Sequence, residues 1–168
     1  DNVLCSFVVT VIDNEDPAVT CPTVAATLST GSNDCEVTLA ELGQASATDN
    51  CDTNVDIVAD LNGPFGPGQH TVTWTATDDA GNSSQCSVTF TVVDDIDPII
   101  TCPVPETNYQ ADPDNCTASL TFSADATDNC GVDFIKYFIG ATEITFPYNF
   151  PIGTTTVKAV ATDIHGNS

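Results

Sequence analysis

Short apolar segments that alternate with polar residues predict β-strands along the whole chain. Residues 6–12, 70–77 and 87–93 are rich in Val, Thr and aromatic side chains and alternate in part, as half-buried strands do. Gly, Pro, Asn and Asp separate such segments at short intervals, for example at residues 79–82. No segment sustains the 3.6-residue period of an amphipathic helix. The predicted fold class is therefore all-β, with short strands in antiparallel sandwiches.

The expected strands form two similar sets. The first covers residues 19–29, 35–42, 55–61, 70–77 and 86–93, with room for a short strand between 61 and 70. The second covers residues 100–110, 116–123, 132–139, 142–146 and 154–162. Residues 3–12 are similar in sequence to the last strand of the first set, and the second set contains no such strand. One set is thus complete, the other is short of a strand, and one strand stands apart from both.

The cysteines show that the two sets are repeats. They recur after 81, 81, 81 and 79 residues, so that Cys5, Cys21, Cys35 and Cys51 are followed by Cys86, Cys102, Cys116 and Cys130. A period of this length is that of a small domain rather than of a solenoid unit. We predict three parts: residues 1–12 as the last strand of a preceding or neighbouring-subunit repeat, residues 13–97 as a complete domain, and residues 98–168 as a domain that lacks its last strand.

The charge excludes several classes of partner. Two basic residues, Lys136 and Lys158, stand against 24 acidic ones, for a net charge of −22. Nucleic-acid binding is excluded because phosphates need Lys and Arg contacts, and anionic membrane surfaces are disfavoured for the same reason. No apolar run reaches the roughly 18 residues of a membrane span, so membrane insertion is not expected. At this charge the acids are either solvated or partly neutralised by divalent cations.

The unmatched strand at residues 1–12 has two explanations. A domain without its last strand exposes a sheet edge, which the next repeat of a longer array would cover. Alternatively, residues 1–12 of one subunit complete the second domain of another subunit by donor-strand addition. In both cases the partners are copies of the chain or adjacent repeats, joined head to tail through residues 1–12. Both explanations predict a filament or fibre.

Five motifs keep their order in the repeats and resemble the hyalin repeat (HYR) family. In the first repeat they are Asp-Pro-Ala-Val-Thr-Cys-Pro at 16–22, Ala-Thr-Asp-Asn-Cys at 47–51, Gly-Gln-His-Thr-Val at 68–72, Ala-Thr-Asp-Asp-Ala-Gly-Asn at 76–82 and Cys-Ser-Val-Thr-Phe-Thr-Val at 86–92. The resemblance covers essentially the whole chain. It implies tandem immunoglobulin-like β-sandwiches, head to tail, in an extracellular or cell-surface protein of adhesion or matrix. The acidic, Arg-free composition is closer to bacterial surface arrays than to animal matrix proteins.

The eight cysteines indicate disulfides, because no CxxC pair occurs and the chain has only two His. In the immunoglobulin-like topology that the resemblance implies, Cys21, Cys51 and Cys86 fall at one end of the domain. We expect two of these three to pair, with Cys86 as one partner. Cys35 then bridges to Cys102 or Cys130, or alternatively to Cys51 or Cys21 within its own domain. The partner of Cys5 belongs to a preceding segment or another subunit.

Acidic residues concentrate in the two linkers and in the loops that this topology brings beside them. The first group is Asp13, Glu15, Asp16, Asp49 and Asp78; the second is Asp94, Asp95, Asp97, Asp128 and Asp163. Calcium takes about six to eight oxygen ligands, several from carboxylates, so each junction is a candidate calcium site that would stiffen it. The alternative is that these residues are ordinary turn formers and solvated.

No residues suggest catalysis. His70 falls on a strand and His165 in a turn, without a Gly-x-Ser-x-Gly motif, and Trp74 is expected in the core. Asn82 and Asn115 begin N-glycosylation sequons. We therefore expect no enzyme activity in the chain but an extracellular structural repeat of a surface fibre, a rigid scaffold with disulfides and interdomain calcium. The alternatives are an adhesin module that recognises glycan or protein through its loops, and an accessory domain of a secreted enzyme.

Overall fold

The computed structural model of the chain describes residues 4–104 and 108–168, and these form two compact units. Unit 1 comprises Asp1–Leu28 and Glu36–Val92, and unit 2 comprises Ser29–Cys35 and Val93–Ser168. Residues 29–35 thus fold with unit 2, although both neighbouring segments of the chain belong to unit 1. The predicted three-part division stays a prediction, and its residues 1–3 and 105–107 lie outside the described ranges.

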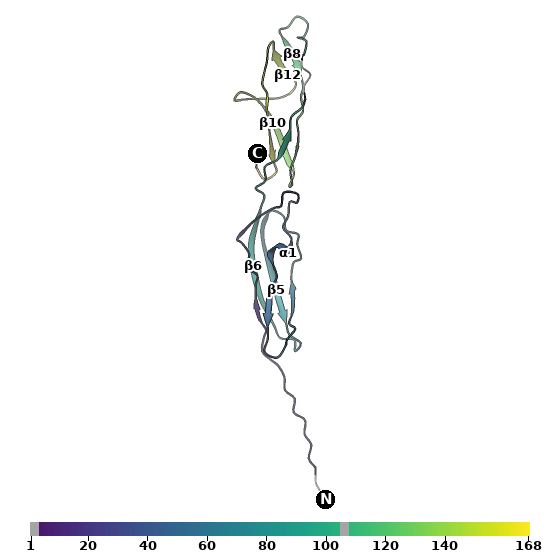
Figure 1. Cartoon of the computed structure of the whole chain (residues 1–168), viewed down its shortest axis with the longest axis vertical. Coiled ribbons are helices and arrows are strands. Elements are labelled where there is room, and N and C mark those ends of the chain that lie inside the picture. Colours follow the sequence, from purple (N-terminus) through teal and green to yellow (C-terminus); the bar gives the residue numbers. More distant parts are fainter. Residues whose placement is uncertain (1–3, 105–107) are drawn as a thin grey trace. The chain divides into compact units, whose positions relative to one another are not determined.

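Unit 1 is built on a four-stranded antiparallel sheet (Figure 1). Its strands are β2 (Thr27–Ser29), β6 (Ser83–Val93), β5 (Gly68–Thr77) and β4 (Asp56–Ala59), in that order across the sheet. Only the last residues of β2 and β6, Ser29 and Val93, are grouped with unit 2. A second sheet pairs β1 (Ala18–Thr20) with β3 (Ser46–Thr48). The long central hairpin β5–β6 keeps a continuous register from Gly68 opposite Val92 to Thr77 opposite Ser83. Its alternating burial confirms the strand pattern read from the sequence.

The core of unit 1 lies on one face of this hairpin. Strand β5 buries Val72 and Trp74, and strand β6 buries Phe90 and Val92. The ring of Phe90 meets that of Phe65 edge to face, with centroids 5.4 Å apart. Because β6 supplies two of the core side chains, unit 1 depends on its last strand for hydrophobic packing as well as for hydrogen bonds.

The strand expected at residues 35–42 is wrong. Val37 makes only an isolated bridge to Phe65, and the chain then forms one helical turn, α1 (Leu39–Leu42). The backbone N–H and the hydroxyl of Thr38 both donate to Glu41 Oε2, at 2.6 and 2.8 Å. These hydrogen bonds hold the pKa of Glu41 below its ordinary value, and the bond from the Thr38 backbone has the larger effect. A Thr-x-x-Glu sequence favours a helix start over a strand.

The described residues of unit 2 form three smaller antiparallel sheets. One orders β11 (Thr142–Ile144), β10 (Val132–Ile139) and β13 (Lys158–Asp163); the others pair β12 (Tyr148–Pro151) with β8 (Thr117–Leu120), and β7 (Ile99–Thr101) with β9 (Asp125–Thr127). An aromatic cluster packs between them: Phe122 meets Phe146 and Phe150 at 5.7 and 5.8 Å, and Tyr137 meets Phe146 at 4.8 Å. Both units are therefore all-β with antiparallel sheets, as expected for an immunoglobulin-like fold.

Several expected strands are shorter than predicted. The segment 19–29 divides into β1 and β2, since Pro22 lacks the N–H that a ladder requires. Of the strand expected at residues 100–110, the structure contains β7 (Ile99–Thr101), which begins one residue before the predicted segment. Residues 105–107 of that segment lie outside the described ranges. Residues 154–157 are not in a strand, and β13 begins at Lys158. Strands β3, β9 and β12 were not predicted, because each is too short to show a period.

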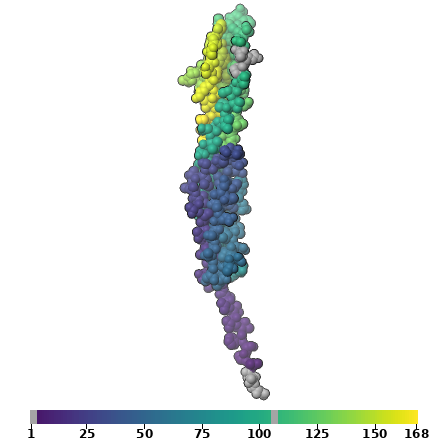
Figure 2. Space-filling view, viewed as in Figure 1, coloured from purple at the N-terminus to yellow at the C-terminus, as the bar shows by residue number. Residues whose placement is uncertain are grey.

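The strand predicted at residues 3–12 does not form over the described residues 4–12. This segment is an extended chain without a sheet partner (Figures 1 and 2). Its apolar side chains are exposed, Leu4, Val8 and Val11 by 93%, 92% and 89%. Sequence alternation marks a segment able to pair, but the strand itself requires a neighbouring backbone. Across the described residues, none of the helical structure has the length and apolar character to cross a membrane.

Candidate functional site

Two disulfides link distant parts of the chain. Cys21 bonds to Cys86 within unit 1, with Cα atoms 5.7 Å apart, and Cys35 bonds to Cys130 within unit 2, at 4.6 Å. The first is one of the pairings expected for Cys86, and the second is one of the four pairings left open for Cys35. Four thiols are free and exposed: Cys5, Cys51, Cys102 and Cys116.

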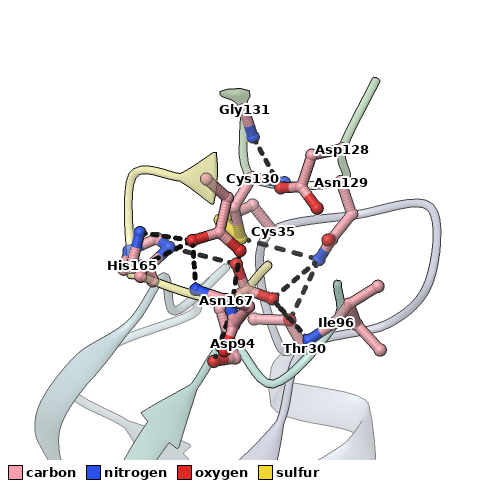
Figure 3. A network of polar contacts seen from close by, with 12 residues as sticks. Thr30, Cys35, Asp94, Ile96, Asp128, Asn129, Cys130, Gly131, His165 and Asn167 are labelled. Atoms are coloured by element: carbon pink, nitrogen blue, oxygen red, sulfur yellow. Dashed lines mark hydrogen bonds and ion pairs between the residues drawn. A yellow bond between two sulfur atoms is a disulfide. The ribbon is translucent and has the colours of Figure 1, made fainter. Parts of the chain in front are cut away.

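The Cys35–Cys130 disulfide stands beside a network around Asp94 (Figure 3). The Asp94 carboxylate is fully buried, with none of its side chain exposed. His165 Nδ1 lies 3.1 Å from Asp94 Oδ2, and the hydroxyl of Thr30 and the backbone N–H of Ile96 donate to Oδ1 at 3.3 and 3.2 Å. The side-chain amide of Asn167 donates to the Asp94 carbonyl at 3.2 Å. The linker carboxylate is thus held by groups from three segments of unit 2.

Asn129 extends this network to the loop that carries Cys35. Its side-chain amide donates to the Thr30 hydroxyl at 3.0 Å and to the Gly31 carbonyl at 3.1 Å. The neighbouring residue, Cys130, bonds covalently to Cys35. Residues 29–35 are therefore fixed to unit 2 by a disulfide and by hydrogen bonds, which explains why they fold with it. The Oδ1 atom of Asn129 is buried without a hydrogen-bond partner.

The same turn occurs in both units. In unit 1, the backbone and side-chain N–H groups of Asn82 donate to the Asp78 carboxylate at 2.8 and 2.7 Å. In unit 2, those of Asn167 donate to Asp163 at 2.9 and 2.7 Å. The side-chain bond from Asn82 is the main cause that holds the pKa of Asp78 below its ordinary value. Burial alone would raise the pKa of Asp163, but the bonds from Asn167, His165 and Gly166 outweigh it and leave the pKa lowered.

In unit 1, carboxylates of the linker and of two loops come together. Oxygens of Asp13, Asp49 and Asp78 all lie within 4.8 Å of one another. Asp49 also accepts the backbone N–H groups of Cys51 and Asp52, at 2.8 and 2.9 Å. Desolvation by neighbouring atoms, followed by the charges of Asp13 and Asp49, raises the pKa of the exposed Cys51 thiol. This cluster offers oxygen ligands only, as calcium requires.

The corresponding cluster of unit 2 is different in composition. Asp94, Asp163 and His165 bring their ligand atoms within 4.8 Å of one another. A histidine nitrogen is a poor ligand for calcium, and here it partners the linker carboxylate instead. Asp128 Oδ1 accepts the backbone N–H groups of Cys130 and Gly131 at 2.8 and 2.9 Å, while its Oδ2 is buried without a partner.

The remaining predicted ligands lie outside both clusters. Glu15 accepts the side-chain amide of Asn50 at 2.6 Å, Asp95 accepts the Ser29 hydroxyl at 2.8 Å, and Asp16 and Asp97 are exposed. Sequence reasoning did not identify His165 and Asn129 as members of the junction. The signal available for Asn129 was its place directly before a cysteine. The signal for His165 was its place in the repeat, where the first unit has Ala80.

Other residues singled out in the sequence have structural surroundings. Trp74 is 4% exposed and packs in the core of unit 1. The Nε2 atom of His70 lies 2.7 Å from the Gly66 carbonyl, and its ring stacks against Phe65 and Phe90. Of the two sequon residues, Asn82 is half-buried in its turn and Asn115 is exposed.

The comparisons with known proteins agree with this architecture. No curated protein matches the chain. Residues 12–92 match the family model of the HYR domain, a segment that begins in the first linker and ends in β6. It contains the Cys21–Cys86 disulfide and all three acids of the unit 1 cluster. The match, with the all-β fold, supports the HYR family for residues 12–92 of this chain.

Proposed function

We propose that this chain is a structural repeat of an extracellular surface fibre, in which it acts as a stiff spacer. The HYR match suggests an extracellular, adhesion-type repeat module, and two disulfides are typical of an oxidising compartment.

The observation that carries the proposal is the placement of residues 29–35 in unit 2. The chain passes between the units at 28–29, at 35–36 and at 92–93, so three covalent connections join them instead of one. The Cys35–Cys130 disulfide and the Asn129 amide fix the inserted loop to unit 2. Each added covalent connection lowers the conformational entropy of the linker. A spacer that transmits force needs a linker restrained in this way.

Calcium at the unit 1 cluster belongs to this proposal. Asp13 comes from the linker, whereas Asp49 and Asp78 come from loops, and their oxygens converge. A bound calcium ion would offset the repulsion of these carboxylates and fix the linker to the loops. The Asp94 cluster achieves a similar junction with His165 and Asn167, so we do not extend the calcium proposal to it.

Calorimetric titration with calcium tests that part. We expect binding heat and a raised melting temperature for the wild-type chain, and neither for Asp49→Asn. Asp16→Asn is the matched control, because Asp16 is an exposed acid of the same linker outside the cluster. Equal responses of the two variants would contradict the site.

Immunogold labelling tests the fibre role. Antibodies raised against the chain should decorate filaments on the surface of intact source cells. Label confined to the cell interior, or to a secreted monomer, would contradict the proposal. For stiffness, we expect the distribution of distances between a spin label on each unit to broaden when Cys35 and Cys130 are both replaced by alanine. An unchanged distribution would show that the disulfide does not restrain the junction.

A further inference from the structure

We propose that two copies of the chain bind each other through the outer faces of their sheets, unit 1 of one copy against unit 2 of the other. The face on unit 1, called the acidic face, consists of Asp56, Val58 and Asp60. The face on unit 2, called the lysine face, consists of Phe134, Lys136, Phe138, Lys158 and Val160. The inference rests on the proposed fibre role and deepens it by naming the partner and the contact.

The register of the sheets shows that the two faces occupy equivalent places in their units. Asp56 of β4 lies opposite Thr77 of β5, and Phe134 of β10 lies opposite Thr162 of β13. Each of these threonines directly precedes the buried aspartate of its turn. Strand β10 is therefore the counterpart of β4, and β13 is the counterpart of β5.

Equivalent positions on these strands carry opposite chemistry. Side chains at alternate positions of a strand lie on the same side of the sheet. On β4 the outer side chains are Asp56 and Val58, followed by Asp60 just beyond the strand; on β10 they are Phe134, Lys136 and Phe138. The acidic face thus carries an apolar side chain between two carboxylates. The lysine face carries an ammonium group between two aromatic rings.

The lysine face encloses a hollow between β10 and β13. The hollow has a volume of about 290 Å³, and Val160 and Lys158 line it from β13. On β10, Phe134 is 41% exposed, and the ammonium group of Lys136 lies 5.4 Å from the centre of its ring. Apolar walls beside ammonium groups suit a partner that offers an apolar side chain flanked by carboxylates.

Lys158 has no ion pair within the described part of the chain, although the sequence contains 24 acidic residues. Lys136, the other basic residue, already pairs with Glu143 at 3.3 Å. At physiological ionic strength the Debye length is about 8 Å, so the charges near a contact decide whether two acidic copies attract or repel there. Lys158 therefore gives the lysine face an uncompensated positive charge that an acidic surface can neutralise.

The acidic face is accessible although its sheet has a strand on the far side of β5. Val58 is 66% exposed, because β6 extends the sheet in its own plane and does not cover the outer face. A strand beside β13 would extend the sheet of unit 2 in the same way and would leave the lysine face open. The contact therefore does not depend on what precedes or follows these residues.

The contact joins two different surfaces, so that one copy can use both of them at once. Contacts of this heterologous kind produce open assemblies when they do not close into a ring. Each contact is small, and association of the isolated chain is expected to be weak. Many such contacts act together between two fibres, and they would hold neighbouring fibres to each other.

Sedimentation velocity over a concentration series tests the contact. The free thiols are alkylated and divalent cations are chelated, so that neither new disulfides nor bridging ions contribute. The sedimentation coefficient of the wild-type chain should rise with concentration. Asp56→Lys and Lys158→Glu should each weaken association at least about tenfold, because each places like charges opposite each other. Asp34→Lys is the matched control: it changes the net charge equally at an exposed acid outside both faces, and it should associate like the wild type.

Charge exchange distinguishes this contact from a general effect of net charge. An equimolar mixture of Asp56→Lys and Lys158→Glu should associate within about threefold of the wild type, because each face again meets an opposite charge. The double variant D56K/K158E keeps the net charge of −22 and should also associate. Recovery in the double variant without dependence on concentration would place the contact within one chain and overturn the inference.

A second pair of variants tests the apolar part of the contact. Val58→Ser should weaken association about fivefold. Ile99→Ser is the matched control, because Ile99 is a strand residue that is 73% exposed and lies outside both faces; equal weakening by the two variants would contradict the contact. The fluorescence of Trp74 verifies that unit 1 stays folded in each variant.

Two results for the wild-type chain would overturn the inference. One is a chain that stays monomeric over the whole concentration series. The other is a chain that binds an acidic polysaccharide such as polygalacturonate through Lys158 without self-association. Neither result would affect immunogold labelling of surface filaments, so the fibre role would stand. Conversely, self-association through these faces without labelled filaments would contradict the fibre role and leave the contact intact.

Discussion

Replacing both Cys21 and Cys86 with alanine will destabilise unit 1 by about 4 kcal/mol. The disulfide closes a loop of 65 residues, and the loss of loop-closure entropy from the unfolded chain accounts for that magnitude. Both cysteines also pack against the core cluster, and Cys86 faces Trp74 in the register of β5 and β6. For a domain of this size, about 4–8 °C of melting temperature is lost per kcal/mol, so we expect a fall of roughly 15–30 °C.

Trp74 makes this measurement local. It is the only tryptophan of the chain, and it is 4% exposed in the core of unit 1. Its fluorescence during urea denaturation therefore reports unfolding of unit 1 without a contribution from unit 2. The slope of free energy against urea should rise in the variant, since the unfolded chain without the cross-link exposes more surface.

The control is Cys51→Ala, which removes an exposed free thiol of the same unit. It should change the free energy of unfolding by less than about 0.5 kcal/mol. A loss of less than about 1 kcal/mol in the double variant, with an unchanged slope, would refute the reasoning. It would mean that the hydrophobic core of unit 1 holds β6 in place without the disulfide.

Three further predictions concern unit 1. Phe90→Ala should cost about 3–5 kcal/mol by urea denaturation, because it opens a cavity against Phe65; a cost below about 1 kcal/mol would mean that β6 is not part of the core. Glu41→Ala removes the acceptor of both Thr38 bonds and should lower the urea midpoint of unit 1 slightly, whereas the exposed control Glu36→Ala should leave it unchanged. Asn82→Ala removes a donor to Asp78 and should cost about 1–2 kcal/mol at neutral pH. The pKa of folded Asp78 lies below its ordinary 3.8, so this stabilisation is present above pH 3.8 and is lost as the pH falls through the folded-state pKa. The free energy of unfolding of Asn82→Ala should therefore fall less steeply in acid than that of the wild type. Parallel acid curves would contradict the role of Asn82.

Much of the fold was predictable because strands leave a local record. The long hairpin β5–β6 alternates buried and exposed residues, and this period is visible in the sequence of 70–77 and 87–93. Short elements leave no such record: β3, β9 and the single turn of α1 contain three or four residues each. For α1, the Thr38 and Glu41 pair was present in the sequence, but the apolar residues around it favoured a strand.

The candidate site was predictable in its residue types and only partly in its grouping. Repeat arithmetic identified the linker acids and loop acids, and Asp13, Asp49 and Asp78 do come together. The repeat alignment alone did not show that this cluster contains only carboxylate oxygens, whereas in its counterpart in unit 2 His165 contacts Asp94. The repeat shows that His165 stands where the first unit has Ala80, but its contact with Asp94 joins residues 71 positions apart and is visible only in the folded chain. Calcium binding itself stays a prediction.

The sequence by itself determined the all-β class, the repeat of about 80 residues, and the limited set of partners for each cysteine, because periodicity and spacing are properties of the chain alone. Tertiary structure decided which partners were chosen: Cys21 for Cys86, and Cys130 for Cys35. It also decided that residues 29–35 fold with unit 2 and that both lysines line one hollow of its sheet. These features depend on contacts between residues far apart in the chain, whose free energies exist only when the backbone has brought them together.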